Sequence, residues 1–274
     1  AEAYRRSGKW TEALRLNEKA LALYDKHSPD SYKRAYVLNA MALVYNTTDD
    51  PKLRDPDKAI ASYLQALAVY EKTKGKRHPL VISPHQNLVS VYFTKGDYSS
   101  ALEHAQIYYE IALAYYGPDS PKARDGMESL SASYYNLKRY REALEWSQRA
   151  VELNKKLEGP DSPEMRYSME NYGRSLVGLG RGLEAIPVLE RTLKWFEAEK
   201  APDPEDLGEV RFALARALRD TKRDPERAVA LATRARDDFT TAKATKKADE
   251  VDKWLRAPSS GAGKRRGALG SRDY

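Results

Sequence analysis

The sequence predicts an all-α fold, namely an α-solenoid of stacked helix–turn–helix units. Three observations predict it. A small residue recurs about every 42 residues, apolar side chains within each recurring unit follow helical spacing, and no segment alternates with the period of two that is typical of strands. The composition agrees with this fold, because 41% of the 274 residues are hydrophobic and can form a core.

An alanine that follows a short turn marks the start of the second helix in each unit. It occurs six times, with spacings of 46, 42, 42, 42 and 43 residues: Ala13, Ala59, Ala101, Ala143, Ala185 and Ala228. A second set keeps the same phase in the first helix of the units: Leu88, Leu130, Tyr172 and Leu214. A phase kept over so many copies indicates one repeated supersecondary unit.

Local signals predict where the helices begin and end. Within one copy, Ala59, Tyr63, Ala66 and Tyr70 form the apolar stripe of an α-helix. A capping side chain followed by proline predicts helix starts at three places: Ser120-Pro121, Ser162-Pro163 and Asp203-Pro204. Glycines that also step by 42 residues suit helix C-termini: Gly75, Gly117 and Gly159. Pro84 falls inside an expected first helix, so we expect a late start or a kink there.

The second copy resembles a tetratricopeptide repeat (TPR). Its two halves are Leu38-x2-Met41-Ala42-x2-Tyr45 and Ala59-x3-Tyr63-x2-Ala66. The 42-residue period and the Gly-Pro-Asp-Ser-Pro loops are similar to the longer repeats of kinesin light chains. The resemblance covers about residues 1–245, and it implies a right-handed superhelix with a concave inner wall.

The predicted organisation has three parts. Residues 1–245 form the repeat array (a half repeat plus five repeats), residues 246–257 a C-terminal capping helix, and residues 258–274 a flexible basic tail. Because Ala1 aligns with the middle of a first helix, we expect the chain to be the C-terminal piece of a longer protein. The tail accounts for +3 of the net charge of +7, so the remaining body is too weakly basic to demand a nucleic-acid partner.

The sequence favours no catalytic, metal or cofactor site. Without cysteine there is no disulfide scaffold, thiolate zinc site or cysteine nucleophile. The four histidines lack the His-Glu-x-x-His spacing, and Gly173-x4-Gly178 lacks the Lys-Ser/Thr of a phosphate loop. We therefore expect a protein that is not an enzyme and has no cofactor. We also expect a cytoplasmic protein without a membrane partner, because neither a signal peptide nor an apolar run of about 20 residues is present.

Side chains between the packing positions of the first helices are expected to line a groove. Eight of them are the candidate partner-binding residues: Asn39, Asn87, Phe93, Tyr135, Asn171, Arg174, Arg216 and Arg219. An amide can both donate to and accept from an extended backbone. The resemblance to kinesin light chains implies that the three asparagines hold a peptide. The alternative is that they are polar residues tolerated on a hydrated helix face.

The groove residues also predict what the partner carries. Phe93 and Tyr135 would offer apolar anchors, and the three arginines would make the C-terminal part basic, with Glu128 and Glu170 partly offsetting them. These features favour a protein or peptide partner with an apolar side chain and an acidic stretch.

The predicted function is a non-catalytic protein–protein interaction scaffold. The Ala- and Arg-rich style of the repeats resembles the regulatory or sensor region of a larger bacterial signalling protein, such as a serine/threonine kinase. Two alternatives stay open: an RNA- or nucleic-acid-binding helical-repeat module, which the tail and the tyrosines permit, and self-association through the exposed half repeat.

Overall fold

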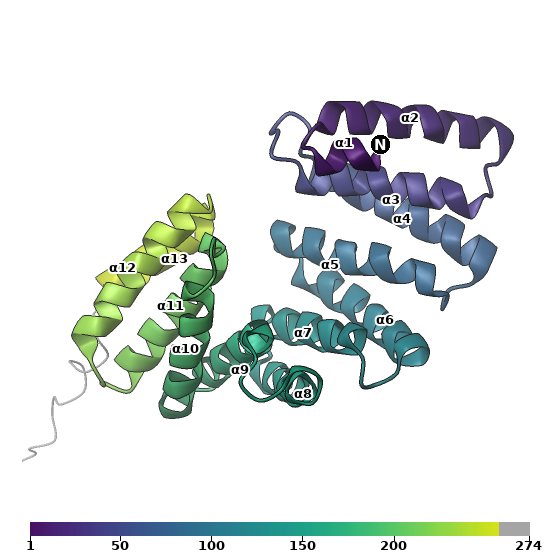
Figure 1. Ribbon diagram of the computed structural model, residues 1–274. Coiled ribbons are helices and arrows are strands. Elements are labelled where there is room, and N and C mark those ends of the chain that lie inside the picture. The colour runs from purple at the N-terminus through teal and green to yellow at the C-terminus, as the bar shows by residue number, and fades with distance from the viewer. Residues whose placement is uncertain (258–274) are drawn as a thin grey trace, which may run out of the picture. The chain divides into compact units, whose positions relative to one another are not determined.

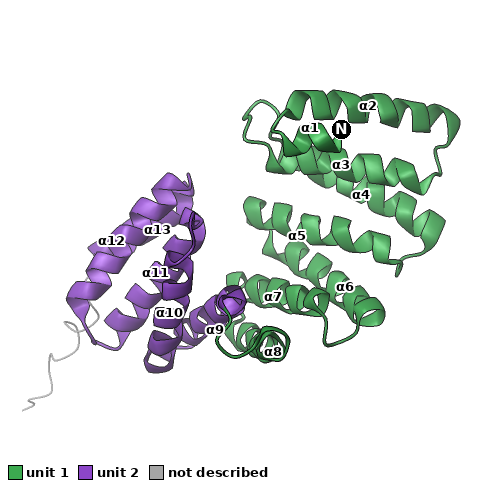
Figure 2. Ribbon diagram, viewed as in Figure 1, with its two compact units in different colours: residues 1–162 green, residues 163–274 purple. Residues whose placement is uncertain are grey.

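The computed structural model describes residues 1–257, and the predicted basic tail at 258–274 lies outside the described residues. Over the described part the chain is all-α, with paired helices and no strand (Figure 1). The chain divides into two compact units, residues 1–162 (unit 1) and residues 163–274 (unit 2), as Figure 2 shows. The predicted fold class is confirmed.

Unit 1 is built from successive helices that each pack on the next one along the chain. The elements are α1 (Glu2–Arg6), α2 (Trp10–His27), α3 (Tyr32–Thr47), α4 (Pro56–Lys74), the 3-10 turn η1 (Pro79–Val81), α5 (Ile82–Lys95), α6 (Tyr98–Tyr116), α7 (Pro121–Asn136) and α8 (Tyr140–Glu158). In each antiparallel pair, α3/α4, α5/α6 and α7/α8, the odd-numbered member is the first helix.

Unit 2 continues the same pattern. Its described elements are the 3-10 turn η2 (Pro163–Met165), α9 (Arg166–Gly178), α10 (Gly182–Glu197), α11 (Pro204–Asp220), α12 (Pro225–Thr241) and α13 (Thr245–Arg256). Helix α13 packs against α12, in the place that the first helix of a further pair would take.

The caps explain most of the helix boundaries. The Ser120 side chain accepts a hydrogen bond from the backbone N–H of Ala123, and Asp203 accepts one from that of Glu205, each ahead of a proline in the first turn. Ser162-Pro163 leads instead into η2, and the α-helix begins only at Arg166. In α5 the late start expected from Pro84 is what occurs, because η1 precedes the α-helix.

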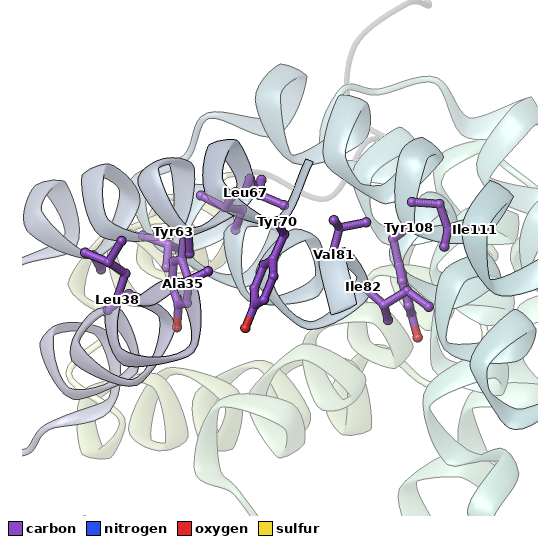
Figure 3. Packing of buried hydrophobic residues seen from close by; sticks show 14 of the residues in the cluster. Ala35, Leu38, Tyr63, Leu67, Tyr70, Val81, Ile82, Tyr108 and Ile111 are labelled. Atoms are coloured by element: carbon purple, nitrogen blue, oxygen red, sulfur yellow. The ribbon is translucent and has the colours of Figure 1, made fainter. Parts of the chain in front are cut away.

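The repeated alanines are the closest-packed positions of the fold. All six have no exposed surface. Figure 3 shows part of the unit 1 core, where side chains from α3, α4, η1 and α6 pack together: Ala35, Leu38, Tyr63, Tyr70, Val81 and Tyr108. In unit 2, α11 and α12 approach so closely at Gly208 that a Cβ there would lie 2.7 Å from the Phe239 ring. Neighbouring pairs thus bury a shared core, as stacked repeats require.

Candidate functional site

The first helices are packed on two sides and uncovered on the third. On α3, Leu38 and Ala42 belong to the core shared with α4 and α5, while Met41 and Val44 pack against α2. On α5, Leu88 and Val91 face the core shared with α4, and Val89 faces the one shared with α6 and α7. The remaining positions recur with helical spacing and carry polar or partly exposed side chains.

These remaining positions form a surface that we call the unit 1 strip. It consists of Tyr36, Asn39 and Leu43 of α3 together with Gln86, Asn87 and Ser90 of α5. Helices α3 and α5 contact each other, so the two halves of the strip adjoin (Figure 1). Tyr36 is 61% exposed, whereas the side-chain oxygen of Asn39 is buried and has no hydrogen-bond partner among the described residues.

The structure therefore brings the two predicted asparagines of unit 1 onto one surface. Both side chains are half-buried. Because an amide rotates easily about its terminal torsion, Asn39 can turn its oxygen towards a donor on the surface. The Oδ1 atom is the kind of group that gains most from a ligand, since an unpaired buried acceptor costs about 1–3 kcal/mol.

The two predicted aromatic anchors take part in the packing of their own repeats. The Phe93 ring meets Tyr98 edge-on, with 5.5 Å between the ring centroids, and Tyr135 lies 5.4 Å from Tyr140. Both also pack against the core that includes Leu130. They lie beside the tight turns and are half-buried, so each offers only part of its ring to a partner.

In unit 2 the equivalent positions hold an ion-pair chain. Arg174 of α9 lies 3.0 Å from the carboxylate of Glu170 and 3.1 Å from that of Glu209 on α11. Glu209 also pairs with Lys247 of α13, which lies 2.7 Å from Glu205. These five residues link α9, α11 and α13, and the side chains of Glu170, Arg174 and Glu209 are largely buried. Those of Glu205 and Lys247 are partly exposed.

The protonation of the acidic residues in and beside this ion-pair chain follows from their burial. Burial raises the pKa of Glu170 to about 8, and the Arg174 charge offsets this only in part. Burial acts on Glu209 in the same direction, but Arg174 and Lys247 together hold the pKa of that carboxyl below its usual value. Burial also raises the pKa of Asp206 to about 6, although Tyr167 donates a hydrogen bond to its carboxylate.

The other predicted residues of unit 2 also have local surroundings that matter for binding. Asn171 is only 9% exposed. Arg219 stacks on the indole ring of Trp254 and donates a hydrogen bond of 2.7 Å to the Trp254 carbonyl, and burial lowers its pKa. The Arg216 guanidinium lies 6.0 Å from the centre of the Phe212 ring. Arg174 and Arg219 are thus held by groups of unit 2 itself.

Sequence reasoning missed the partners of these arginines. Arg174 and Glu209 are 35 residues apart in sequence, as are Arg219 and Trp254, and Glu205 and Lys247 are 42 apart. Only the Glu205–Lys247 separation equals the repeat period, so a search for complementary side chains one period apart would have found that pair. The separation of 35 residues is seven residues shorter than the period, and such a search would have missed the partners of Arg174 and Arg219.

A buried histidine pair lies in unit 1, between α5 and α6. The Nδ1 atoms of His85 and His104 are 2.9 Å apart, and Tyr92 stacks on His104. Burial lowers the pKa of His85 to about 4 and also lowers that of His104. Within residues 1–257 no three side chains of the kinds that bind metals gather into a site. No helix in that range is long and apolar enough to cross a membrane.

Two family models of the tetratricopeptide repeat match parts of the chain. One matches residues 52–114, and the other matches residues 1–28 and 126–164. No curated protein matches the sequence.

Solved structures reproduce the fold at low sequence identity. BtubC (BKLC) from P. vanneervenii superposes with a TM-score of 0.62 at 17% identity, covering 97% of this chain and 98% of that one. A structure of nearly identical TPR-like repeats from a kinesin light chain of Podosopora anserina superposes with a TM-score of 0.58 at 18% identity. The match covers 77% of this chain and 97% of that one. A Rap protein complexed with Competence and Sporulation Factor gives 0.56 at 14% identity, covering 93% and 71%. The chain therefore matches tetratricopeptide-repeat models over these segments and shares the fold of these solved structures.

Proposed function

We propose that this chain is a non-catalytic scaffold that binds a protein or peptide segment on the uncovered faces of its first helices. The observation that carries the proposal is the unit 1 strip, where Asn39 and Asn87 present amides and the Asn39 oxygen has no partner. The structure of the Rap protein with Competence and Sporulation Factor supports it by showing that a related fold holds another molecule. The regulatory or sensor role in a larger signalling protein rests on the sequence resemblance alone.

The prediction of an acidic partner segment concerns unit 2. The ion pairs of Arg174 with Glu170 and Glu209 lower the positive charge that this unit offers. An acidic segment would therefore have to compete with the Glu209 carboxylate, which is already paired with Arg174, and this favours unit 1 as the main binding surface.

Self-association is a separate proposal, and it rests on α2. Leu23 of this helix is 62% exposed. If copies of the chain pair through this face, sedimentation velocity should show a concentration-dependent dimer that Leu23→Glu abolishes. A monomer at all concentrations would reject self-association and leave peptide binding untouched.

Selection from a displayed library of random 12-residue peptides, followed by fluorescence anisotropy of the enriched peptides, tests the main proposal. Wild-type chain should give saturable binding. The double variant Asn39→Ala/Asn87→Ala should weaken it about tenfold, since each lost hydrogen bond is worth about 1 kcal/mol. Gln106→Ala on α6, an exposed amide outside the strip, is the matched control. No saturable binding, or equal binding by all three proteins, would contradict the proposal.

A further inference from the structure

Two first helices of unit 1, α3 and α5, contain long stretches without charged residues. Residues 35–48, which make up most of α3, contain no Asp, Glu, Lys or Arg, and neither do residues 79–94, which make up most of α5. The chain as a whole is 32% charged. A helix face that is exposed only to solvent normally carries charged side chains, so two neighbouring uncharged faces indicate a contact with something other than water.

The uncharged residues are not all in the core. Ser90 and Tyr36 are exposed, and Asn39, Leu43, Gln86 and Asn87 are half-buried. Aromatic, aliphatic, amide and hydroxyl groups thus share one surface, which is the mixture typical of the centre of a protein interface.

Two of the charged groups on the helices that flank the strip are paired within the protein. Arg5 of α1 lies 2.7 Å from the carboxylate of Glu2. On α7, the next first helix, Asp125 lies 3.0 Å from Arg124. The strip residues themselves carry no charge, and an exposed cation, Lys33, lies one turn before Tyr36 on α3.

We infer that the unit 1 strip binds an extended polypeptide segment that is poor in charged residues. Its backbone N–H and C=O groups would meet the amides of Asn39 and Asn87, and an apolar or aromatic side chain would pack on Tyr36 and Leu43. The inference rests on the proposed function and specifies its partner.

The physical reason for the low charge of the partner is the cost of removing a charged side chain from water where no opposite charge awaits it. A charged partner side chain placed on this surface would lose water and meet no opposite charge, which is costly, whereas backbone amides and apolar groups would find matching partners. Neighbouring helices are about 9 Å apart and an extended chain advances about 3.3 Å per residue, so the part of the segment that reaches from one helix to the other spans roughly three residues. A nucleic acid is disfavoured, because no lysine or arginine lies on the strip to meet its phosphates.

The peptide selection described above tests the inference through the composition of the winners. For the wild-type chain, the aligned centre of the enriched peptides should contain less than half the charged residues of the unselected library. Ser90→Glu should shift the winners towards Lys and Arg, and Ser90→Lys should shift them towards Asp and Glu. Gln106→Glu and Gln106→Lys, also exposed and in mid-helix but on α6, should leave the winners unchanged.

A second pair of variants distinguishes a specific aromatic contact on the strip from non-specific binding to exposed aromatic rings. Tyr36→Ala should weaken binding of a selected peptide about tenfold or more, while Tyr115→Ala, which removes a ring that is 52% exposed at the end of α6, should leave it within twofold. Circular dichroism spectra of both variants check that the helix content is unchanged.

Each outcome decides one of the two proposals. Winners rich in charged residues, or winners that ignore the charge placed at Ser90, would overturn the uncharged segment while leaving a peptide-binding scaffold. Tight, salt-sensitive binding of a single-stranded thymidine oligonucleotide that Ser90→Glu abolishes would overturn it in favour of nucleic acid. Failure of any peptide to enrich would overturn the proposed function itself.

Discussion

Unit 1 and unit 2 use the same helical repeat but carry different chemistry on the uncovered faces of their first helices. In unit 1 these faces on α3 and α5 are uncharged. In unit 2, Glu170, Arg174 and Glu209 occupy the corresponding faces and pair with one another. The comparison teaches that packing fixes two sides of a first helix and leaves the third to be specialised.

The two units also differ in how well their buried polar atoms are satisfied. Four such atoms of unit 1 have no hydrogen-bond partner: the oxygen of Asn39, the hydroxyls of Tyr63 and Tyr108, and Nε2 of His85. The corresponding atoms of unit 2 belong to side chains that form ion pairs, such as Arg166 with Glu199 at 2.7 Å. Unit 2 therefore uses its polar groups for its own stability, whereas unit 1 keeps some without partners.

The largest expected effect comes from breaking the ion-pair chain. Glu209→Gln removes the carboxylate that Arg174 and Lys247 share, and leaves each cation with one acidic partner, Glu170 for Arg174 and Glu205 for Lys247. We expect unit 2 to lose about 2 kcal/mol of unfolding free energy, since hydrogen bonds to charged groups are lost. Ser90→Ala, on the exposed strip of unit 1, should change the stability of that unit by less than about 0.5 kcal/mol.

Unit-specific urea unfolding measures this difference. Trp10 and Trp146 report on unit 1, and Trp195 and Trp254 on unit 2, so chains that keep only one pair give separate curves. Equal losses in both units after Glu209→Gln, or none in unit 2, would contradict the proposed role of the ion pairs.

The two units should respond to pH in opposite directions. His85 has a pKa of about 4 in the folded chain, below its usual 6.5, so unit 1 is fully stabilised above pH 6.5 and loses stability as the pH falls towards 4. Glu170 has a pKa of about 8, above its usual 4.5, so unit 2 is stabilised at acidic pH and loses stability as the pH rises from 4.5 through 8. Each change should amount to roughly 1–2 kcal/mol over two pH units.

Urea unfolding of the same two tryptophan pairs at pH 5 and pH 8 tests this crossing. His85→Phe should reduce the acid sensitivity of unit 1, with the lowered pKa of His104 leaving a remainder. Glu170→Gln, which imitates the protonated acid, should reduce the alkaline sensitivity of unit 2, with the raised pKa of Asp206 leaving a remainder. Parallel pH profiles in the two units would show that neither group controls stability.

A smaller effect concerns the glycines at close helix contacts. A Cβ at Gly208 would lie 2.7 Å from the fully buried Phe239 ring, so Gly208→Ala should destabilise unit 2 by about 1–2 kcal/mol. At Gly126 of unit 1 the nearest atoms of Tyr109 are 3.0 Å away, and the gain in helix propensity of about 0.5–1 kcal/mol offsets most of the strain. Melting temperatures of the two variants compare these costs, and an equal loss at both glycines would reject the difference.

The sequence predicted the packing of the repeat better than its uncovered faces. The six alanines lie at zero exposure because a fixed helix–helix distance admits only a small side chain there, and such a requirement recurs in every copy. Asn39 and Asn87 were placed on the strip by the same phase. The contacts that hold Arg174 and Arg219 could not be predicted from the repeat phase, because they depend on which side chain of a neighbouring helix reaches each arginine.

The same limit applies to the histidine pair. Nothing about His85 and His104 in the sequence marks them as neighbours, since they lie on different helices and do not recur in other copies. The boundaries expected at residues 245 and 257 likewise stay a prediction, because they describe how the repeat array ends, which the phase of the repeats does not determine.

The smallest expected effect tests the unpaired hydroxyls of unit 1. Figure 3 shows the Tyr63 and Tyr108 rings with their oxygens pointing to the same side of the core. Both hydroxyls are buried without a partner, so replacing either ring by phenylalanine removes an unsatisfied group and no hydrogen bond. Tyr63→Phe and Tyr108→Phe should therefore leave unit 1 as stable or stabilise it by up to about 1 kcal/mol.

Thr192→Val in unit 2 is the control for these substitutions, because the Thr192 hydroxyl donates a hydrogen bond of 2.9 Å to the Val188 carbonyl and its loss should cost about 1 kcal/mol. Thermal unfolding of the three variants gives the comparison. A loss of stability in the phenylalanine variants as large as that in Thr192→Val would mean that the tyrosine hydroxyls are bonded to ordered water. In that case the contrast between a satisfied unit 2 and an unsatisfied unit 1 would hold only for the amide of Asn39.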